Sequence, residues 1–376
     1  MRKKSMKIDI FELERRQSIW ENRVQYNLTE SGVHPYTLSE LLTENEIKEL
    51  LSIRLGYGQT NGSIELRETI SRLYPGTDLD NVLVTNGSSE ANFIATWSIL
   101  EPEDELILML PNYMQIWGIA QSFGITIKPL YLKEHLHWQP EIEELKDLLS
   151  PNTKMITICN PNNPTGAVLE EEVMQEIASQ AKKSDAWIYS DEIYRGSEIE
   201  GDETPSFWGL YHKTLISCGL SKAYALPGLR IGWLIGPKST IEMMWSYHDY
   251  ISITSGILSN RIAALVLQPE RRQKVLERNR RMIRDNLIIL KRWVEKHADI
   301  FQFIPPQAGG IAFLKYKMDI NSTEFTTKLR EEKSVFIVAG DCFGMDNYIR
   351  IGIGSERDYF LAGLALIDEV LEEINR

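Results

Sequence analysis

From residue 81 onward the chain alternates short apolar runs with longer amphipathic stretches. The runs are typical of strands and occupy residues 81–85, 105–110, 154–159, 186–190, 214–217 and 230–235. Strands that alternate with helices build a parallel or mostly parallel sheet with helices packed on it. The sequence therefore predicts an α/β fold, with longer helical stretches at residues 8–25, 238–250, 268–298 and 356–375.

A lysine lies between two of the predicted strands. Lys222 follows the run at 214–217, and Arg230 begins the next run. Because ligand sites collect where the strands of an α/β sheet end, a partly desolvated lysine there can act as a nucleophilic amine. The Ser221 hydroxyl and the Arg230 guanidinium on the same loop can hold a phosphate group. A surface lysine in a glycine-bracketed loop is the alternative interpretation.

A second phosphate-binding candidate is the Gly-Ser-Ser turn at residues 87–89, which precedes a helix expected to start near Glu90. Backbone N–H groups and the positive dipole end of a helix N-terminus attract phosphate. A simple helix cap would explain the same residues.

Three other turns carry side chains suited to a flat heterocycle. Tyr113 lies just past the second apolar run, where an aromatic ring can stack on a ligand or pack into the core. Asn163 lies in the string Asn-Pro-Asn-Asn-Pro-Thr-Gly, and its amide can donate to a phenolate oxygen. Asp191 and Tyr194 follow the fourth run, and a carboxylate there can keep a pyridine nitrogen protonated.

Together these motifs resemble the class I and II aminotransferases, which are fold-type I enzymes dependent on pyridoxal phosphate (PLP). The resemblance rests on Ser-Lys followed by Gly-Leu-Arg-x-Gly, on the Asn-Pro-x-Asn-Pro-Thr-Gly string and on the other motifs, over roughly residues 25–370. It implies an α/β/α large domain with a mostly parallel sheet and a smaller α+β domain built from both chain ends. The implied boundaries are an N-terminal segment at 1–44 that packs with the small domain, a PLP-binding domain at 45–255 and a small C-terminal domain at 256–376.

The resemblance also implies a role for each motif residue. Lys222 would form a Schiff base with PLP and act in catalysis together with Asp191 and Tyr194. The phosphate would be held by Gly87, Ser88, Ser89, Ser221 and Arg230, and by Tyr57 reaching across a homodimer to the neighbouring site. The ring would be held by Tyr113, Asn163, Asp191 and Tyr194. The substrate would be bound by Arg350, Gly32 and Asn163, with Arg350 on the α-carboxylate.

One position departs from the resembled pattern. Family members often carry Ser-x-Ser-Lys, and the first serine would fall on Gly219 here. This departure removes one hydroxyl that could have bound the phosphate.

The implied activity is exchange of an amino group between an L-amino acid and a 2-oxo acid. Residues 31–36 are also similar to a stretch of capreomycidine synthase, so a PLP-dependent lyase or a capreomycidine-synthase-like cyclase is the alternative. A PLP-sensing DNA-binding regulator is disfavoured, because the chain of 376 residues has no spare length and a net charge of -12.

The composition of the chain limits the classes of partner and the cellular compartment that we expect for the protein. The acidic balance disfavours nucleic acid and anionic membranes as partners. Residues 1–4 are basic without a following apolar stretch, so no signal or transit peptide is predicted. The widely spaced Cys159, Cys218 and Cys342 indicate reduced core residues, and His135 with His137 lack the spacing of a metal site. We expect a soluble, cytoplasmic protein without a metal.

Overall fold

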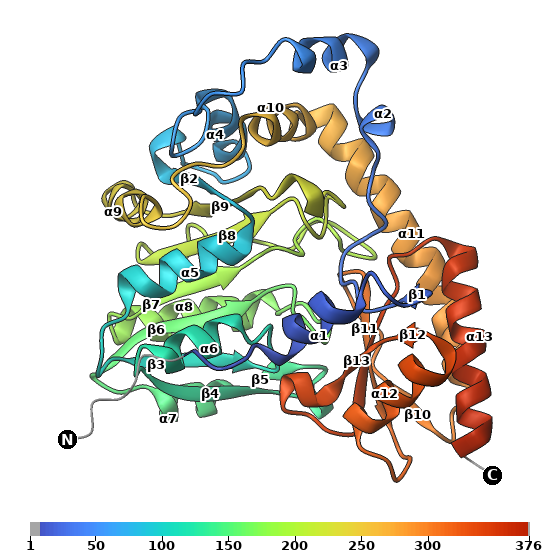
Figure 1. Ribbon diagram of the computed structural model, residues 1–376. Coiled ribbons are helices and arrows are strands. Elements are labelled where there is room, and N and C mark those ends of the chain that lie inside the picture. Colours follow the sequence, from blue (N-terminus) through green and yellow to red (C-terminus); the bar gives the residue numbers. More distant parts are fainter. Residues whose placement is uncertain (1–7, 375–376) are drawn as a thin grey trace.

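The computed structural model describes residues 8–374, and the basic run at residues 1–4 lies outside them. Within the described part, a large sheet and a smaller sheet lie side by side, with helices around both (Figure 1). The strands of the large sheet are ordered β2-β9-β8-β7-β6-β3-β4-β5. Their bounds are β2 Val82–Thr85, β3 Glu105–Leu110, β4 Thr126–Lys133, β5 Gln139–Pro140, β6 Thr153–Cys159, β7 Trp187–Asp191, β8 Thr214–Gly219 and β9 Gly232–Ile235.

The large sheet is mostly parallel, as predicted. Strands β8, β7, β6, β3 and β4 are parallel neighbours. Strand β9 is antiparallel to both β8 and β2, so β2 runs in the same direction as β8. The carboxyl ends of β2, β3, β6, β7 and β8 therefore meet at one edge, where an α/β sheet places its ligand site.

Helices cover both faces of the large sheet because successive side chains of a strand point to opposite faces. In β3, Leu106 and Leu108 join a core with α5, α6 and α9, while Ile107 and Met109 join a core with α4, α7, α8 and α10. The bounds of these helices are α4 Ile64–Ser71, α5 Ser88–Ile99, α6 Gln115–Ser122, α7 Ile142–Leu148, α8 Glu171–Lys183, α9 Lys238–His248 and α10 Ile257–Val266. The predicted α/β/α layering is confirmed.

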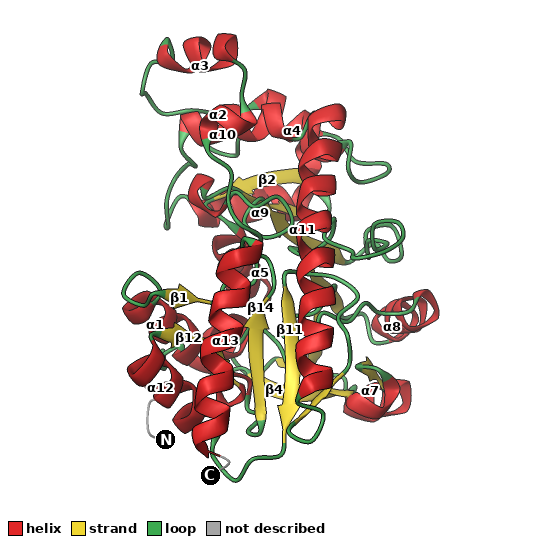
Figure 2. Ribbon diagram, turned by 90° about the vertical axis from the view of Figure 1, so that its right-hand side faces the viewer, coloured by secondary structure: helices red, strands yellow, loops and turns green. Residues whose placement is uncertain are grey.

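The small sheet is antiparallel and has the order β10-β11-β14-β13. Figure 2 shows the long helices α11 and α13 running alongside β11 and β14. The bounds are β10 Phe301–Phe303, β11 Ile311–Tyr316, β13 Val338–Ala339, β14 Tyr348–Gly352, α11 Pro269–Lys296, α12 Ser322–Lys333 and α13 Arg357–Ile374. All of these elements except β13 contribute to one core, whereas Val338 of β13 packs into the core of the large unit.

The N-terminal segment joins this small unit. Strand β1, Tyr26–Asn27, pairs in parallel with β12, Val335–Phe336. The first helix is shorter than predicted: α1 spans Glu12–Trp20 rather than 8–25, and residues 21–25 form a turn and a bend that lead into β1. The expected contribution of both chain ends to a small α+β unit is confirmed.

The remaining elements are short helices and turns. They are α2 Leu38–Leu41 and α3 Glu44–Leu51, with short 3-10 turns η1 Leu79–Asn81, η2 Glu134–Leu136, η3 Pro227–Leu229 and η4 Gly340–Phe343. Among the described helices, none combines the length and apolar character needed to cross a membrane. The domain boundaries at 44 and 255 remain a prediction.

Candidate active site

A cavity of about 340 Å³ opens at the edge where the parallel strands end. Most of the predicted site residues line it, namely Ser88, Ser89, Tyr113, Asn163, Asp191, Tyr194, Ser221, Lys222, Arg230 and Arg350. Gly32 lies beside it, since a Cβ there would be 3.1 Å from the Ser221 carbonyl oxygen and 3.5 Å from the Lys222 Cα. Tyr57 is the exception, because its side chain is 84% exposed on the loop between α3 and α4.

One end of the cavity is an anion cradle at the N-terminus of α5. Its cap residue Gly87 supplies no side-chain hydrogen bond, so N–H groups of the first turn remain available to an anion. The Arg230 guanidinium lies against this turn, because a Cβ on Gly87 would be 2.3 Å from Arg230 Nη2. Nη1 of the same arginine is 3.5 Å from the Ser221 hydroxyl oxygen. Guanidinium, hydroxyl and helix N-terminus thus lie together at this end of the cavity.

The departure at Gly219 has a packing reason. Gly219 pairs with Gly232 where β8 meets β9. A Cβ at position 219 would lie 2.8 Å from the Ile231 carbonyl oxygen and 3.0 Å from the Gly232 Cα. The close approach of the two strands leaves no room for a serine, so the cradle relies on its other donors.

Asp191 is a buried carboxylate at the end of β7. Burial raises its pKa to about 6, although hydrogen bonds from the Ile193 amide and the Asn92 amide group act in the opposite direction. Asn92 is itself oriented by the Tyr189 hydroxyl, which donates to its Oδ1 at 2.5 Å. Among the described residues no cation pairs with Asp191, and a protonated ring nitrogen would supply one.

Two tyrosines frame the space between the cradle and Asp191. Tyr113 follows β3, packs edge-on against Phe11 at 4.9 Å between ring centroids, and donates its hydroxyl to Glu14 at 2.7 Å. The Tyr194 hydroxyl donates to Ser31 at 2.8 Å. Burial raises the pKa of Tyr194 to about 12, so the hydroxyl remains a donor at neutral pH.

Arg350 is buried in β14, with 1% of its surface exposed. Its Nη1 donates to Asn163 Oδ1 at 2.8 Å, and its Nη2 donates to the Thr29 carbonyl oxygen at 2.7 Å. Burial lowers its pKa from the ordinary value. Because Asn163 accepts through Oδ1, its amide N–H groups are left to donate to another group in the cavity.

The charge state of Lys222 differs from the expectation, drawn from the sequence, that burial would disfavour its ammonium form. Burial lowers its pKa, but the Glu30 carboxylate, 2.7 Å from Nζ, and Tyr194 act in the opposite direction, and the net shift is upward. Burial would likewise raise the pKa of Glu30, yet Lys222 and the Gly32 amide lower it to about 2. In this structure the lysine is therefore a stabilised ammonium rather than a neutral amine.

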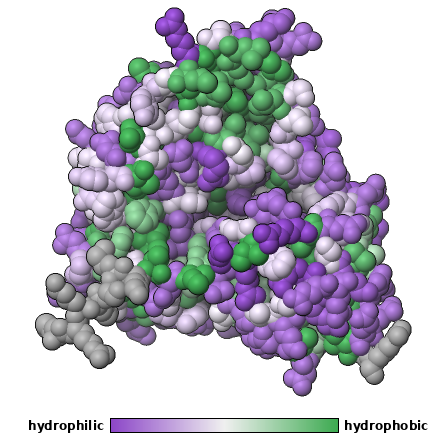
Figure 3. Space-filling view, in the orientation of Figure 1, coloured by the Kyte–Doolittle hydropathy of each residue, from purple (hydrophilic) through white to green (hydrophobic). Residues whose placement is uncertain are grey.

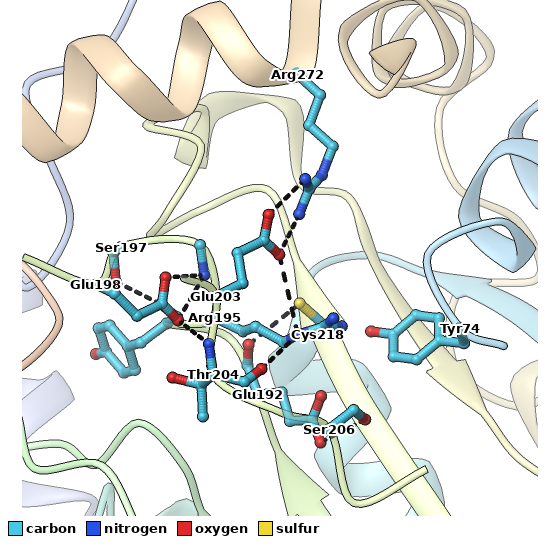
Figure 4. A network of polar contacts seen from close by, with 12 residues as sticks. Tyr74, Glu192, Arg195, Ser197, Glu198, Glu203, Thr204, Ser206, Cys218 and Arg272 are labelled. Carbon is cyan, nitrogen blue, oxygen red and sulfur yellow. Dashed lines mark hydrogen bonds and ion pairs between the residues drawn. The ribbon is translucent and has the colours of Figure 1, made fainter. Parts of the chain in front are cut away.

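A buried polar network behind the site holds the segment that follows Asp191 (Figure 4). Glu192 accepts hydrogen bonds from the Ser206 hydroxyl and the Phe207 amide. Glu198 accepts from the Thr204 amide at 2.9 Å and forms an ion pair with Arg280 at 2.6 Å. Because Glu192 and Glu198 are both held by these contacts, the turn between them, which carries Tyr194, is fixed against the sheet.

The groups that line the cavity fit PLP. An uncapped helix N-terminus beside an arginine suits a phosphate, a buried aspartate without a cationic partner suits a pyridine nitrogen, and a lysine amine suitable for a Schiff base, Lys222, lines the same cavity. On a mostly parallel sheet, this combination defines a fold-type I PLP-dependent enzyme.

The comparisons with known proteins then identify the family. Residues 29–361 match the model of aminotransferase class I and II, so the chain belongs to this family. It is a PLP-dependent aminotransferase, an enzyme that exchanges an amino group between an L-amino acid and a 2-oxo acid.

Particular relatives are similar over nearly the whole chain. A PLP-dependent aminotransferase from Streptococcus suis superposes with a TM-score of 0.93 at 33% identity, covering 98% of this chain and 99% of that one. Capreomycidine synthase from Streptomyces vinaceus is 28% identical over 92% of this chain and 89% of its own length. Aspartate aminotransferase from Pyrococcus horikoshii is 28% identical, covering 88% of each chain.

Several residues that line the cavity were not among the site residues predicted from the sequence. Asn92 could have been found, because it lies one helical turn after Ser88 and so shares its face of α5. Glu30 lies beside Gly32 in a loop whose path the sequence does not reveal. Glu14 and Glu21 are charged residues of the stretch predicted as an amphipathic helix at 8–25, and both line the cavity.

Proposed function

We propose that Lys222 is the amine that engages PLP and moves the substrate proton, and that Arg350 anchors the substrate α-carboxylate. The observation that carries the proposal is that both side chains line one cavity with Asp191 and the anion cradle. When bound, PLP supplies an aldehyde for the substrate amine and a ring that accepts electrons from Cα.

The chain's own residues then have separate tasks. The planar guanidinium of Arg350 binds a carboxylate through two parallel hydrogen bonds and so orients Cα toward Lys222. Lys222 Nζ takes the proton from Cα and returns it as general acid. Asp191 keeps the ring nitrogen protonated, while Tyr194 and Asn163 donate to the ring oxygen.

The test is a visible-absorbance titration of the purified protein with single amino acids and no added 2-oxo acid. An aminotransferase converts its cofactor to the amine form and releases one equivalent of 2-oxo acid. Lys222→Ala should lose both the lysine-linked absorbance and turnover. A variant with wild-type activity would refute the assignment of Lys222.

A cyclase is the second candidate, and similarity to capreomycidine synthase favours keeping it. The same titration separates the two, because a cyclase releases a cyclised amino acid and leaves its cofactor in the aldehyde form. Ammonia release from a β-substituted amino acid would instead indicate a lyase.

We infer a homodimer in which Tyr57 reaches the phosphate of the neighbouring site. Figure 3 shows an apolar area at the top of the molecule, over α3, α4 and α10. Exposed apolar side chains from these segments include Leu51, Leu55, Tyr57, Ile64 and Leu258. Contiguous exposed apolar surface of this kind supports association with a second copy, which sedimentation would detect.

We also propose that the enzyme works in the cytoplasm. Three buried cysteines without disulfides, Cys159, Cys218 and Cys342, support a reducing compartment. Fractionation with a tagged chain would test this. The division at residues 44 and 255 is likewise our proposal, and limited proteolysis would test it.

A further inference from the structure

One wall of the active-site cavity is acidic. Glu14 projects into it from α1, Glu21 follows the end of α1, and Glu30 lies in the loop after β1. Gln17 lines the same wall and fixes α1 to that loop, because its amide donates to the Thr29 hydroxyl at 3.0 Å. Three carboxylates thus face a space that also holds the reactive lysine.

Each of the three cationic side chains that line the cavity already has a role in the proposed function. Arg230 lies at the phosphate cradle, Lys222 is the amine that the cofactor engages, and Arg350 faces the substrate carboxylate. Of these, only Lys222 forms an ion pair with the acidic wall, through Glu30. That pairing requires a protonated lysine, whereas Lys222 must be a neutral amine when it takes the proton from Cα, so at that step Glu30 lacks its cation.

Arg350 gives an independent sign that a ligand completes this cavity. Its Nε is buried and has no hydrogen-bond partner among residues 8–374, although Nη1 and Nη2 are both satisfied. A buried unpaired donor is costly unless a ligand accepts from it. The carboxylates and this donor line one cavity, so a ligand that carries both an anionic and a cationic group would satisfy both.

The carboxylates also act on one another. After burial, the neighbouring charges of Glu30 and Glu14 are the next causes that raise the pKa of Glu21. The three carboxylates are therefore close enough to affect one another's charge.

We propose that Glu14, Glu21 and Glu30 form a subsite for the cationic side chain of the amino-acid substrate, a terminal guanidinium or ammonium group. The proposal rests on the proposed function, since it takes the α-carboxylate to lie on Arg350. An acidic substrate side chain would meet like charge at this wall, whereas a cationic one replaces the Lys222 partner of Glu30.

The test compares L-arginine with L-citrulline, which has nearly the same shape and no charge, by absorbance titration of the PLP-loaded protein. Hydrogen bonds to charged groups contribute about 1.5–3 kcal/mol, so arginine should half-saturate at a concentration about tenfold lower or more. L-ornithine and L-lysine then show whether an ammonium is accepted, and L-aspartate should react more weakly than citrulline.

Substitutions of the glutamates test whether their carboxylates cause the preference for arginine over citrulline. Glu21→Gln and Glu30→Gln should each reduce the arginine-to-citrulline preference about tenfold. Glu12→Gln is the matched control, because Glu12 lies on α1 with the wall residue Glu14 but does not line the cavity. Its carboxylate instead pairs with Arg16 at 3.6 Å. Thermal unfolding confirms that each variant is folded.

The outcomes separate this proposal from the function on which it rests. If citrulline or aspartate converts the cofactor as readily as arginine, or if Glu21→Gln and Glu30→Gln both keep the preference, the subsite is refuted and the aminotransferase assignment stands. If no amino acid converts the cofactor, the proposed function itself fails.

Discussion

Arg350 Nη1 and Asn163 Oδ1 are joined by a hydrogen bond of 2.8 Å that links the small sheet to the large one. Arg350 lies in β14, and Asn163 lies in the turn after β6. The second contact of the guanidinium, with the Thr29 carbonyl oxygen, adds the N-terminal segment. Three separate parts of the chain therefore determine where a substrate carboxylate would sit.

Arg350→Lys should weaken substrate binding while leaving the cofactor in place. Lysine keeps the charge but lacks the planar fork that contacts Asn163 and Thr29 together. Loss of one such hydrogen bond costs about 1.5–3 kcal/mol, so kcat/KM for amino acids should fall about tenfold or more. Steady-state kinetics measure this. Arg357→Lys, at an exposed position, is the control and should behave as wild type.

Gly87→Ala should lower the affinity for PLP. Gly87 has φ of 79°, and a Cβ there would be 2.3 Å from Arg230 Nη2. The methyl group must push the guanidinium away from the phosphate cradle, so we expect the Kd for PLP to rise about tenfold or more. Equilibrium titration of the cofactor-free protein with PLP measures it.

Gly76→Ala is the matched control for this change. Gly76 has nearly the same φ, 77°, but a Cβ there would meet nothing within 4 Å. Both variants should lose about 1–2 kcal/mol of folding stability from left-handed strain. An equal change of the PLP Kd in both would show that strain, rather than contact with Arg230, is the cause.

The motif residues were predictable because each follows a strand, and parallel strands bring their ends together regardless of the intervening chain. Gly87, Asn163, Asp191 and Lys222 are therefore expected at one edge of the sheet without knowledge of the helices. The position of α1 cannot be predicted in this way, because the segment that follows α1 is held by the pairing of β1 with β12, more than 300 residues later in the chain.

The charge state of Lys222 could not be predicted for the same reason. Burial of an amine is visible in the pattern of strands, but its partner Glu30 is contributed by a loop 192 residues earlier. A pKa is set by neighbours in space, and burial and pairing act on a lysine in opposite directions. Strand patterns therefore place Lys222 at the edge of the sheet, and only the packed structure shows that Glu30 is its partner.

Glu192→Gln should remove part of the pH dependence of stability in the cofactor-free protein. Burial raises the pKa of Glu192 to about 7, against the opposing effect of Arg195, while the unfolded chain keeps the ordinary value of 4.5. Between these values the folded state binds the extra proton, so the contribution of Glu192 to stability is fully present below pH 4.5 and is lost as the pH rises through about 7. The loss is on the order of 3 kcal/mol.

Urea unfolding at pH 5 and pH 8 measures this difference. Asp191, whose pKa is raised to about 6, contributes in the same direction and remains in the variant. The variant should therefore show a smaller loss between the two pH values, while Glu200→Gln, at an exposed position in the same segment, should keep the wild-type slope. An unchanged slope in Glu192→Gln would contradict the raised pKa.

Mixing two impaired variants should restore activity if Tyr57 serves the neighbouring site. Lys222→Ala lacks the reactive amine, and Tyr57→Ala lacks the side chain that would reach the partner's phosphate. In a mixed dimer, the site that keeps Lys222 receives Tyr57 from the other protomer and is complete. Random re-association makes half of the dimers mixed, each with one such site, so activity should recover to roughly a quarter of wild type.

Tyr250→Ala is the matched control, because Tyr250 is also 84% exposed. If Tyr57 acts across the dimer, the single variant Tyr57→Ala should bind PLP more weakly, whereas the single variant Tyr250→Ala should bind it normally. Only Tyr57→Ala should therefore recover activity when it is mixed with Lys222→Ala. If instead Tyr57 acted on its own subunit, the mixed dimer would hold one site without the lysine and one without the tyrosine. Activity would then stay at the average of the two parents, which separates the arrangements by a single kinetic measurement.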